Sequence, residues 1–320
     1  MNKILLGITY FLFFQITVYA DVLEDLKSLK YTDTGKSKIF LLISENVTSF
    51  NDVKESFIEE LSNKYDMMIF QKEQELLNNK DIPAQILLKN PELILCIGSK
   101  ALESLTGKIN SVPILFAMVI NYQKFHLEQY TNITGVSLQI PAESIFINFK
   151  TIHENFIRVG VISGKEYINS YLNQEKINLK NIGIYLLIDC INEPSELINS
   201  YQKIKKSIEV LWMVPDYSIF SLENILNLIK ITRQEKMPFV VFSENFVKVG
   251  GLFSVSPNYR TIGSQLAVMA QKIIDDKITP VNISIAPVIG TILTINKNTA
   301  RFIGLDLNKD NEINIDKIVE

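Results

Sequence analysis

The 320-residue chain has few of the residue types that usually carry chemistry: two histidines, two cysteines and one tryptophan. Two histidines are too few for an ordinary zinc site. The sequence also contains neither a Gly-x-Ser-x-Gly elbow nor a phosphate-cradling loop. The formal net charge is −3, and the absence of a basic patch with interleaved aromatic residues argues against nucleic acid as a partner. We therefore expect no catalytic residues, no cofactor and no metal.

The two cysteines, Cys96 and Cys190, lie inside or at the end of apolar, strand-like runs. An oxidising compartment would permit a disulfide between them. We favour two small buried thiols, because both positions are predicted to lie in sheet interiors and a free cysteine behaves as a small hydrophobic residue.

The start of the chain has the pattern of a secretion signal. A short basic head at 1–3 is followed by an apolar core at 4–14 and by small residues within 18–20. The core is shorter than the ~20 apolar residues that a membrane-spanning helix needs. We therefore predict a cleavable signal peptide over 1–20, with an uncleaved anchor as the alternative. No lipid-attachment cysteine follows the core, so we expect a protein free in the periplasm from about Asp21.

Apolar runs of strand length alternate with helical patterns along the rest of the chain. The predicted strands are 38–44, 67–71, 92–99, 113–119 and 133–138 in the first half, and 156–163, 182–188, 210–214, 239–242 and 252–255 in the second. Such alternation implies parallel sheets with right-handed crossovers. We predict an α/β fold with two doubly wound parallel-sheet lobes, which suits the remaining ~300 residues.

Helices are predicted where apolar residues recur with a 3.6-residue period. The inward-facing stripes are Phe50, Val53, Phe57 and Leu61; Ile145, Phe146, Phe149 and Ile152; Leu222, Ile225, Leu226 and Ile229; and Ile262, Leu266, Met269 and Ile273.

Several short sequence motifs carry a family resemblance, and they follow one another in the family's order between about residues 90 and 305. They lie at 96–99, 112–117, 132–136, 213–224, 237–240, 246–254 and 295–305. The chain resembles the substrate-binding component of bacterial ABC transporters, and is most similar to the branch associated with tryptophan- and tyrosine-like ligands. One departure is Gly250-Gly251, where the family usually has Gly-Ala.

The resemblance implies a periplasmic-binding type I fold, in which three crossing segments form a hinge between two lobes. We place these segments near 139–142, 256–260 and 278–284. The N-terminal lobe is then 21–140 plus 258–278, and the C-terminal lobe is 141–257 plus 279–320. The helix at 260–275 returns to the first lobe.

The same resemblance implies function. It makes the chain the periplasmic solute-binding component of an ABC importer. The protein would capture a small, amino-acid-like ligand, aromatic ones included, between its two lobes and deliver it to a permease in the inner membrane. Independently of the resemblance, we take a monomer as the default expectation. Two alternatives stay open: a ligand-sensing module for a membrane receptor, and a secreted α/β enzyme. The enzyme would require a nucleophile–base pair, which the sequence does not show.

Open α/β sheets hold ligands at the carboxyl ends of their strands, so candidate residues are taken from there. In the first lobe they are Ser44, Gly98, Ser99, Phe116, Ala117, Met118, Thr134 and Gly135. Ser99 and the neighbouring N–H groups suit a ligand carboxylate, with helix capping as the alternative. Phe116 and Met118 could form an apolar wall, with core packing as the alternative. Thr134 and Gly135 could donate hydrogen bonds.

In the second lobe the candidates are Ser163, Gly164, Asp216, Ser243 and Glu244. Asp216 follows a strand and is the acid best placed for a ligand ammonium group, with a turn role as the alternative. Ser163 and Gly164 could present backbone N–H groups. Glu244 either faces the ligand or is solvated.

One further stretch, 306–317, places oxygen-bearing side chains at alternating positions, as a calcium loop does. Its sixth position is Asn311 rather than glycine, and its twelfth is Lys317 rather than an acid. We interpret it as a polar C-terminal tail.

Overall fold

The computed structural model describes residues 34–71, 82–305, 307 and 315–320. Contacts divide the described chain into two compact units, one drawn from Met1–Gln139 and Asn258–Gly290 and the other from Ile140–Pro257 and Thr291–Glu320. The predicted signal peptide and most of the calcium-like stretch lie outside the described residues.

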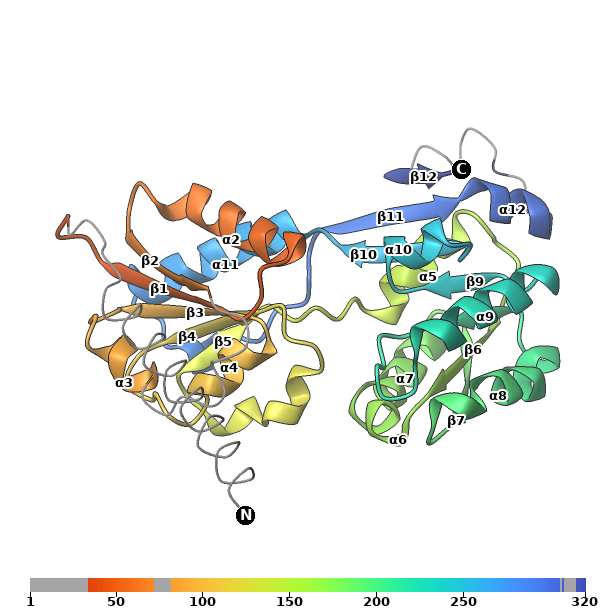
Figure 1. Cartoon of the computed structure of the whole chain (residues 1–320), viewed down its shortest axis with the longest axis horizontal. Helices are drawn as coiled ribbons and strands as arrows, with labels where there is room; N and C mark the ends of the chain where they lie inside the picture. Colours follow the sequence, from red (N-terminus) through yellow and green to blue (C-terminus); the bar gives the residue numbers. More distant parts are fainter. Residues whose placement is uncertain (1–33, 72–81, 306, 308–314) are drawn as a thin grey trace, which may run out of the picture. The chain divides into compact units, whose positions relative to one another are not determined.

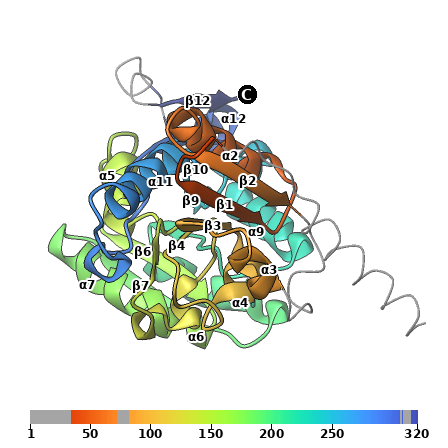
Figure 2. The same ribbon diagram turned by 90° about the vertical axis from the view of Figure 1, so that its left-hand side faces the viewer.

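The first unit is built on a five-stranded parallel sheet. In the order β2-β1-β3-β4-β5, its strands are Asp66–Gln71, Lys38–Ile43, Leu93–Ile97, Ile114–Ala117 and Ile133–Gly135. Its helices are α2 (Thr48–Leu61), α3 (Ile82–Leu87), α4 (Ser99–Leu105) and α11 (Tyr259–Ile274). Helices α2 and α11 cover one face of this sheet, and α3 and α4 cover the other (Figures 1 and 2).

Strand β1 is buried on both faces, which explains its continuous apolar sequence. Ile39, Leu41 and Ile43 pack under α2 and α11, whereas Phe40 and Leu42 pack under α3 and α4. Side chains alternate between the faces of a strand, so a central strand of a covered sheet needs apolar residues at every position.

The second unit holds a seven-stranded sheet. In the order β12-β11-β10-β9-β8-β6-β7, its strands are Lys317–Val319, Thr291–Asn296, Phe253–Pro257, Phe239–Val241, Val210–Trp212, Arg158–Ser163 and Tyr185–Cys190. Its helices are α5 (Ala142–Lys150), α6 (Lys165–Tyr167), α7 (Asn173–Asn181), α8 (Leu197–Ile204), α9 (Leu222–Gln234), α10 (Glu244–Lys248) and α12 (Lys297–Ile303). Helices α5 and α7 cover one face, and α8 and α9 cover the other (Figure 1).

The two predicted α/β lobes are thus confirmed, and all ten predicted strands overlap β1 to β10. The sequence missed β11 and β12, and β11 runs antiparallel to β10, so the second sheet is not purely parallel.

The third crossing between the units also differs from the prediction. Residues 279–290 lie in the first unit, not the second. The reason is their bonding to β5: the Thr134 hydroxyl donates to the Ile283 carbonyl at 2.7 Å, and the Ala286 N–H donates to the Gly135 carbonyl at 2.9 Å.

Two predictions about burial are wrong in part. Cys96 is buried as predicted, but Cys190 is exposed because it ends β7, the edge strand of its sheet. In α9, Leu222 and Leu226 are 67% and 40% exposed. The buried face of that helix is instead Ile225, Leu228, Ile229 and Thr232.

Among the residues that the structure describes, no helix has both the length and the apolar character that a bilayer crossing demands.

Candidate functional site

At the carboxyl end of the second sheet, Asp216 joins the ends of two adjacent strands. It follows β8, and its carboxylate reaches the turn after β6, the neighbouring strand. Oδ2 accepts from the Ser163 hydroxyl at 2.7 Å and from the Gly164 N–H at 2.8 Å. Oδ1 accepts from the Ser218 hydroxyl at 2.6 Å and from its N–H at 3.1 Å. Sequence analysis had selected Ser163, Gly164 and Asp216, and the structure brings these three together.

Their bonding differs from the prediction. The Asp216 side chain is 5% exposed, and each of its oxygens already accepts two hydrogen bonds. A carboxylate oxygen has two lone pairs, so Asp216 has no acceptor capacity left over for a ligand ammonium group. Ser163 is fully buried. The carboxylate therefore holds two strand-end loops in place, which corresponds to the turn role weighed against ligand binding.

An aromatic group at this sheet end was missed by the sequence analysis. Tyr217, next to Asp216, is 61% exposed. Its ring packs edge-on against Phe242 at 6.0 Å between centroids, and Phe242 packs against Phe246 at 5.1 Å. Tyr217 lies in the loop after β8, Phe242 directly follows β9, and Phe246 lies in α10.

Tyr167 lies in α6, which follows β6, and its ring packs edge-on against Tyr171. Burial raises the pKa of the Tyr167 phenol, and the charge of Asp216 raises it further. The hydroxyl is therefore neutral and able to donate throughout the physiological pH range.

Ser243 and Glu244 follow β9 but are in different situations. Ser243 precedes α10 without a side-chain capping bond, and no other described residue hydrogen-bonds its partly exposed hydroxyl. The Glu244 carboxylate is paired with Lys248 at 2.7 Å and with Lys317 of β12 at 2.6 Å. These hydrogen-bonded cations lower the pKa of Glu244, and Lys248 has the largest effect. Glu244 thus anchors the last strand, and is neither free for a ligand nor merely solvated.

In the first unit, Ser44 and Gly98 meet at the ends of neighbouring strands β1 and β3. Gly98 has φ +102°, and a side chain there would collide with the Ser44 hydroxyl and with Phe50. Ser44 is fully buried and donates to the Ile97 carbonyl at 3.3 Å. Ser99 begins α4, is partly exposed, and its hydroxyl has no hydrogen-bond partner among the described residues. Of these three, only Ser99 offers a polar group to a ligand.

The predicted apolar wall is core. Phe116 and Ala117 are fully buried, and Phe116 packs against Tyr122 at 5.7 Å. Met118 is 6% exposed and has the left-handed φ of +58°. Such a conformation is uncommon for a residue with a side chain, and is often found where function constrains the backbone.

Thr134 and Gly135 also have structural roles instead of the predicted donor role. Thr134 is buried and its hydroxyl donates to Ile283. A side chain at Gly135 would collide with the Phe116 carbonyl, so glycine is required by the close approach of β4 and β5.

Two buried amide oxygens near this sheet end have no donor among the described residues. They are Oδ1 of Asn121 and Oε1 of Gln123. Asn121 lies in the loop after β4 with φ +49°, and Gln123 donates through Nε2 to Gln139 at 2.8 Å. Unsatisfied buried acceptors are rare, and a ligand with N–H or O–H groups would satisfy them.

Comparison with known proteins identifies the family. Residues 47–314 match the model of a family described as ABC transporter substrate binding protein. The chain belongs to this family, and is therefore a solute-binding protein rather than an enzyme. A search of curated proteins finds no match.

Solved structures share the fold at low sequence identity. An ABC domain from Streptococcus pneumonia, in complex with L-Trp, is 16% identical with a TM-score of 0.60, covering 88% of this chain and 100% of that one. A ligand-free, open substrate binding protein with adhesive properties from Clostridium difficile is 17% identical with a TM-score of 0.73, covering 88% and 99%. A conserved domain protein from Vibrio cholerae is 18% identical with a TM-score of 0.61, covering 88% and 99%.

Proposed function

We propose that this chain captures a small, ring-bearing, amino-acid-like ligand and delivers it to an ABC permease of the inner membrane, working as a periplasmic monomer. We place the ligand at the carboxyl ends of the strands, where open α/β sheets hold their ligands. Family membership supports the delivery step and a location outside the cytoplasm.

The observation that carries the proposal is Tyr217. A tyrosine that is 61% exposed, backed by Phe242, provides a flat surface on which a ligand ring can stack. The neighbouring Ser243 hydroxyl and the Tyr167 phenol supply polar contacts on the same sheet end. Asp216 fixes the loop from which Tyr217 projects.

Residues of the first unit support an amino-acid-like ligand. The Ser99 hydroxyl can donate to a carboxylate. The amide oxygens of Asn121 and Gln123 can accept from an ammonium group, which carries donors only. This assignment replaces Asp216 as the ammonium partner.

Thermal-shift measurement tests the proposal with a panel of aromatic amino acids, aliphatic amino acids, nucleosides and sugars. A ligand that binds the folded chain raises its melting temperature by mass action. We expect the aromatic amino acids to give the largest shift; L-tryptophan heads the panel because one structural neighbour was solved with it. A shift with sugars or nucleosides and none with amino acids would contradict the proposed ligand class.

Tyr217→Ala tests the site itself. Losing the stacking surface should weaken an aromatic ligand by about tenfold, or roughly 1.4 kcal/mol. Tyr185→Ala is the matched control: that tyrosine is 58% exposed in the same unit but begins β7, at the opposite end of the sheet. Equal affinities of the two variants, measured by titration calorimetry, would remove Tyr217 from the site.

A further inference from the structure

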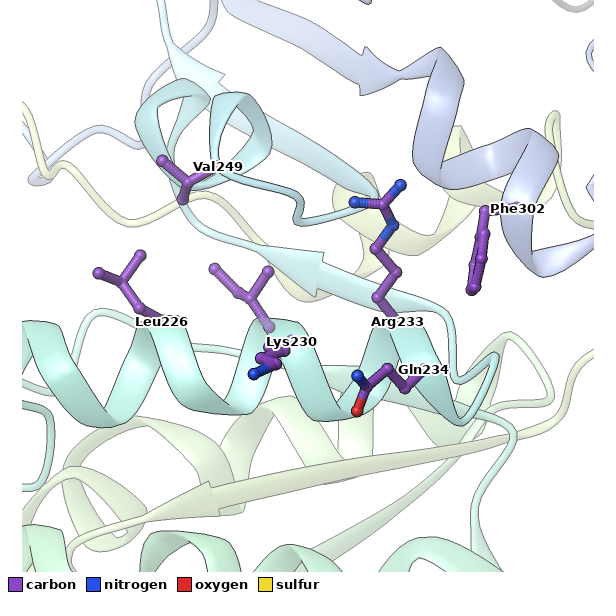
Figure 3. A pocket seen from close by; sticks show the side chains of 7 residues that line it. Leu226, Lys230, Arg233, Gln234, Val249 and Phe302 are labelled. Atoms are coloured by element: carbon purple, nitrogen blue, oxygen red, sulfur yellow. The ribbon is translucent and has the colours of Figure 1, made fainter.

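A pocket lies in the second unit, between α9, α10 and α12. It has a volume of about 350 Å³ and is lined by Leu226, Ile229, Lys230, Arg233, Gln234, Val249 and Phe302 (Figure 3). Five of these residues come from one face of α9, with spacings of three and four residues. Val249 directly follows α10, and Phe302 belongs to α12.

This pocket is separate from the site at the strand carboxyl ends. Arg233 and Gln234 end α9, just before β9 begins, and Val249 lies shortly before the start of β10. The pocket therefore lies toward the amino ends of these parallel strands, whereas Tyr217 and Ser243 lie at the carboxyl ends of β8 and β9.

The charged residues that line the pocket are all positive. Its described lining contains Lys230 and Arg233 and no acidic residue. Neither cation forms an ion pair with another described residue. The Arg233 guanidinium lies 5.1 Å from the centroid of the Phe302 ring. This contact uses the flat face of the guanidinium and leaves the N–H groups at the edge of the guanidinium to bind an anion.

The remaining surface of the pocket is apolar and open to solvent. Leu226, Val249 and Phe302 are 40%, 53% and 49% exposed, and buried Ile229 lies below them. Leu226 belongs to the stripe whose period predicted burial, yet it remains 40% exposed. Exposed apolar residues grouped around cations are typical of a binding surface.

Gly250 and Gly251 hold Val249 at this position. Gly250 has φ +115°, and a side chain there would approach Ile229 at 3.1 Å. A side chain at Gly251 would lie 2.9 Å from the Phe246 carbonyl oxygen and from Val241. The second glycine therefore permits close packing against Phe246 and Val241.

We infer that this pocket binds a small organic carboxylate with an apolar body, its carboxylate on Arg233 and Lys230 and its ring or short chain against Phe302, Val249 and Leu226. The volume is within the range of small-molecule pockets. The inference does not depend on the ligand class proposed for the strand-end site.

Titration calorimetry with benzoate, phenylacetate and hexanoate tests the inference, with benzamide and benzylamine as neutral and cationic analogues. We expect saturable binding of the carboxylates, at least about tenfold tighter than of the two analogues. Raising the salt concentration should weaken the carboxylates, because solvent-exposed cations are screened.

Arg233→Gln should weaken the carboxylates by about tenfold, and Lys176→Gln, an exposed lysine of α7, should leave them unchanged. Melting curves by circular dichroism check that each variant is folded. No saturable binding, equal binding of benzamide, or unchanged binding to Arg233→Gln would each overturn the inference. So would carboxylate binding that is lost in Tyr217→Ala, since that result places the probe at the strand ends.

Discussion

At the scale of single residues, Asp216 shows how a polar residue at a strand end can serve the site indirectly. Its position was predictable, because Asp216 follows a buried strand. Its role was not, because the two hydroxyls and two N–H groups that it accepts come from separate parts of the chain. Burial of a carboxylate requires such compensation.

Asp216→Ala should destabilise the fold. The change leaves four donors without an acceptor near a buried position, at a cost of about 3 kcal/mol. Urea unfolding measures this loss in the free energy of unfolding. The control is Ser163→Ala, which removes one of those donors and should lower the free energy of unfolding by only about 1 kcal/mol. If Asp216→Ala unfolds like the unmodified chain but loses ligand affinity, Asp216 contacts the ligand and the structural role is wrong.

Glu175 gives a pH-dependent prediction. Its carboxylate is 6% exposed and accepts from the Ala142 N–H at 2.8 Å, at the start of the second unit. Burial raises its pKa above the usual 4.5; the Ala142 hydrogen bond opposes this and Glu143 adds to it. The folded chain therefore binds this proton more tightly than the unfolded chain, so stability falls as the pH rises from about 4.5 through the folded-state pKa.

Glu175→Gln should remove this dependence, because glutamine keeps an acceptor for Ala142 without carrying charge. We expect the variant to gain stability over the unmodified chain between acidic and neutral pH, measured by urea unfolding at both. A variant that instead loses relative stability toward neutral pH would show that the charged form is favoured in the fold.

At the scale of elements, periodicity predicted the helices that bury a full stripe. The predicted stripes of α2 and α11 are buried at every position. In α9 the buried residues differ from the predicted stripe, because Leu222 is the first helical residue and Leu226 lines an open pocket. Strand β12 is three residues long and begins with Lys317, so it lacks the fully apolar run that predicted the equally short β8 and β9.

The aromatic site residues were missed for a related reason. Phe242 continues an apolar strand run, and Tyr217 lies in a loop. Their contact depends on β8 and β9 being neighbours, which one sequence does not state. Thr134 was misassigned because its partner, Ile283, is 149 positions away along the chain.

The packing of α11 on α2 supports a direct test. A side chain at Gly263 of α11 would lie within 2.9 Å of backbone and side-chain atoms of α2, at Ser56 and Phe57. Gly263→Ala should therefore destabilise the first unit by about 1–3 kcal/mol, although alanine alone favours a helix.

Val268→Ala provides the control for Gly263→Ala. Val268 is on the same helix and 53% exposed, so its replacement should change the free energy of unfolding by less than about 0.5 kcal/mol. Urea unfolding of both variants measures the difference. A stabilised Gly263→Ala chain would mean that α2 and α11 are not in close contact.

At the scale of the whole molecule, the chain passes three times between its two units, and the family is that of ABC transporter substrate binding proteins. We propose that a ring-bearing, amino-acid-like ligand is held at the strand ends and is released unchanged.

Titration calorimetry of the chain with L-tryptophan, followed by recovery of the ligand, tests this central claim most directly. We predict saturable binding of one ligand per chain with a negative heat-capacity change, and chemically unaltered tryptophan on recovery. Absence of saturable heat with tryptophan, tyrosine and phenylalanine, or recovery of a converted product, would contradict it.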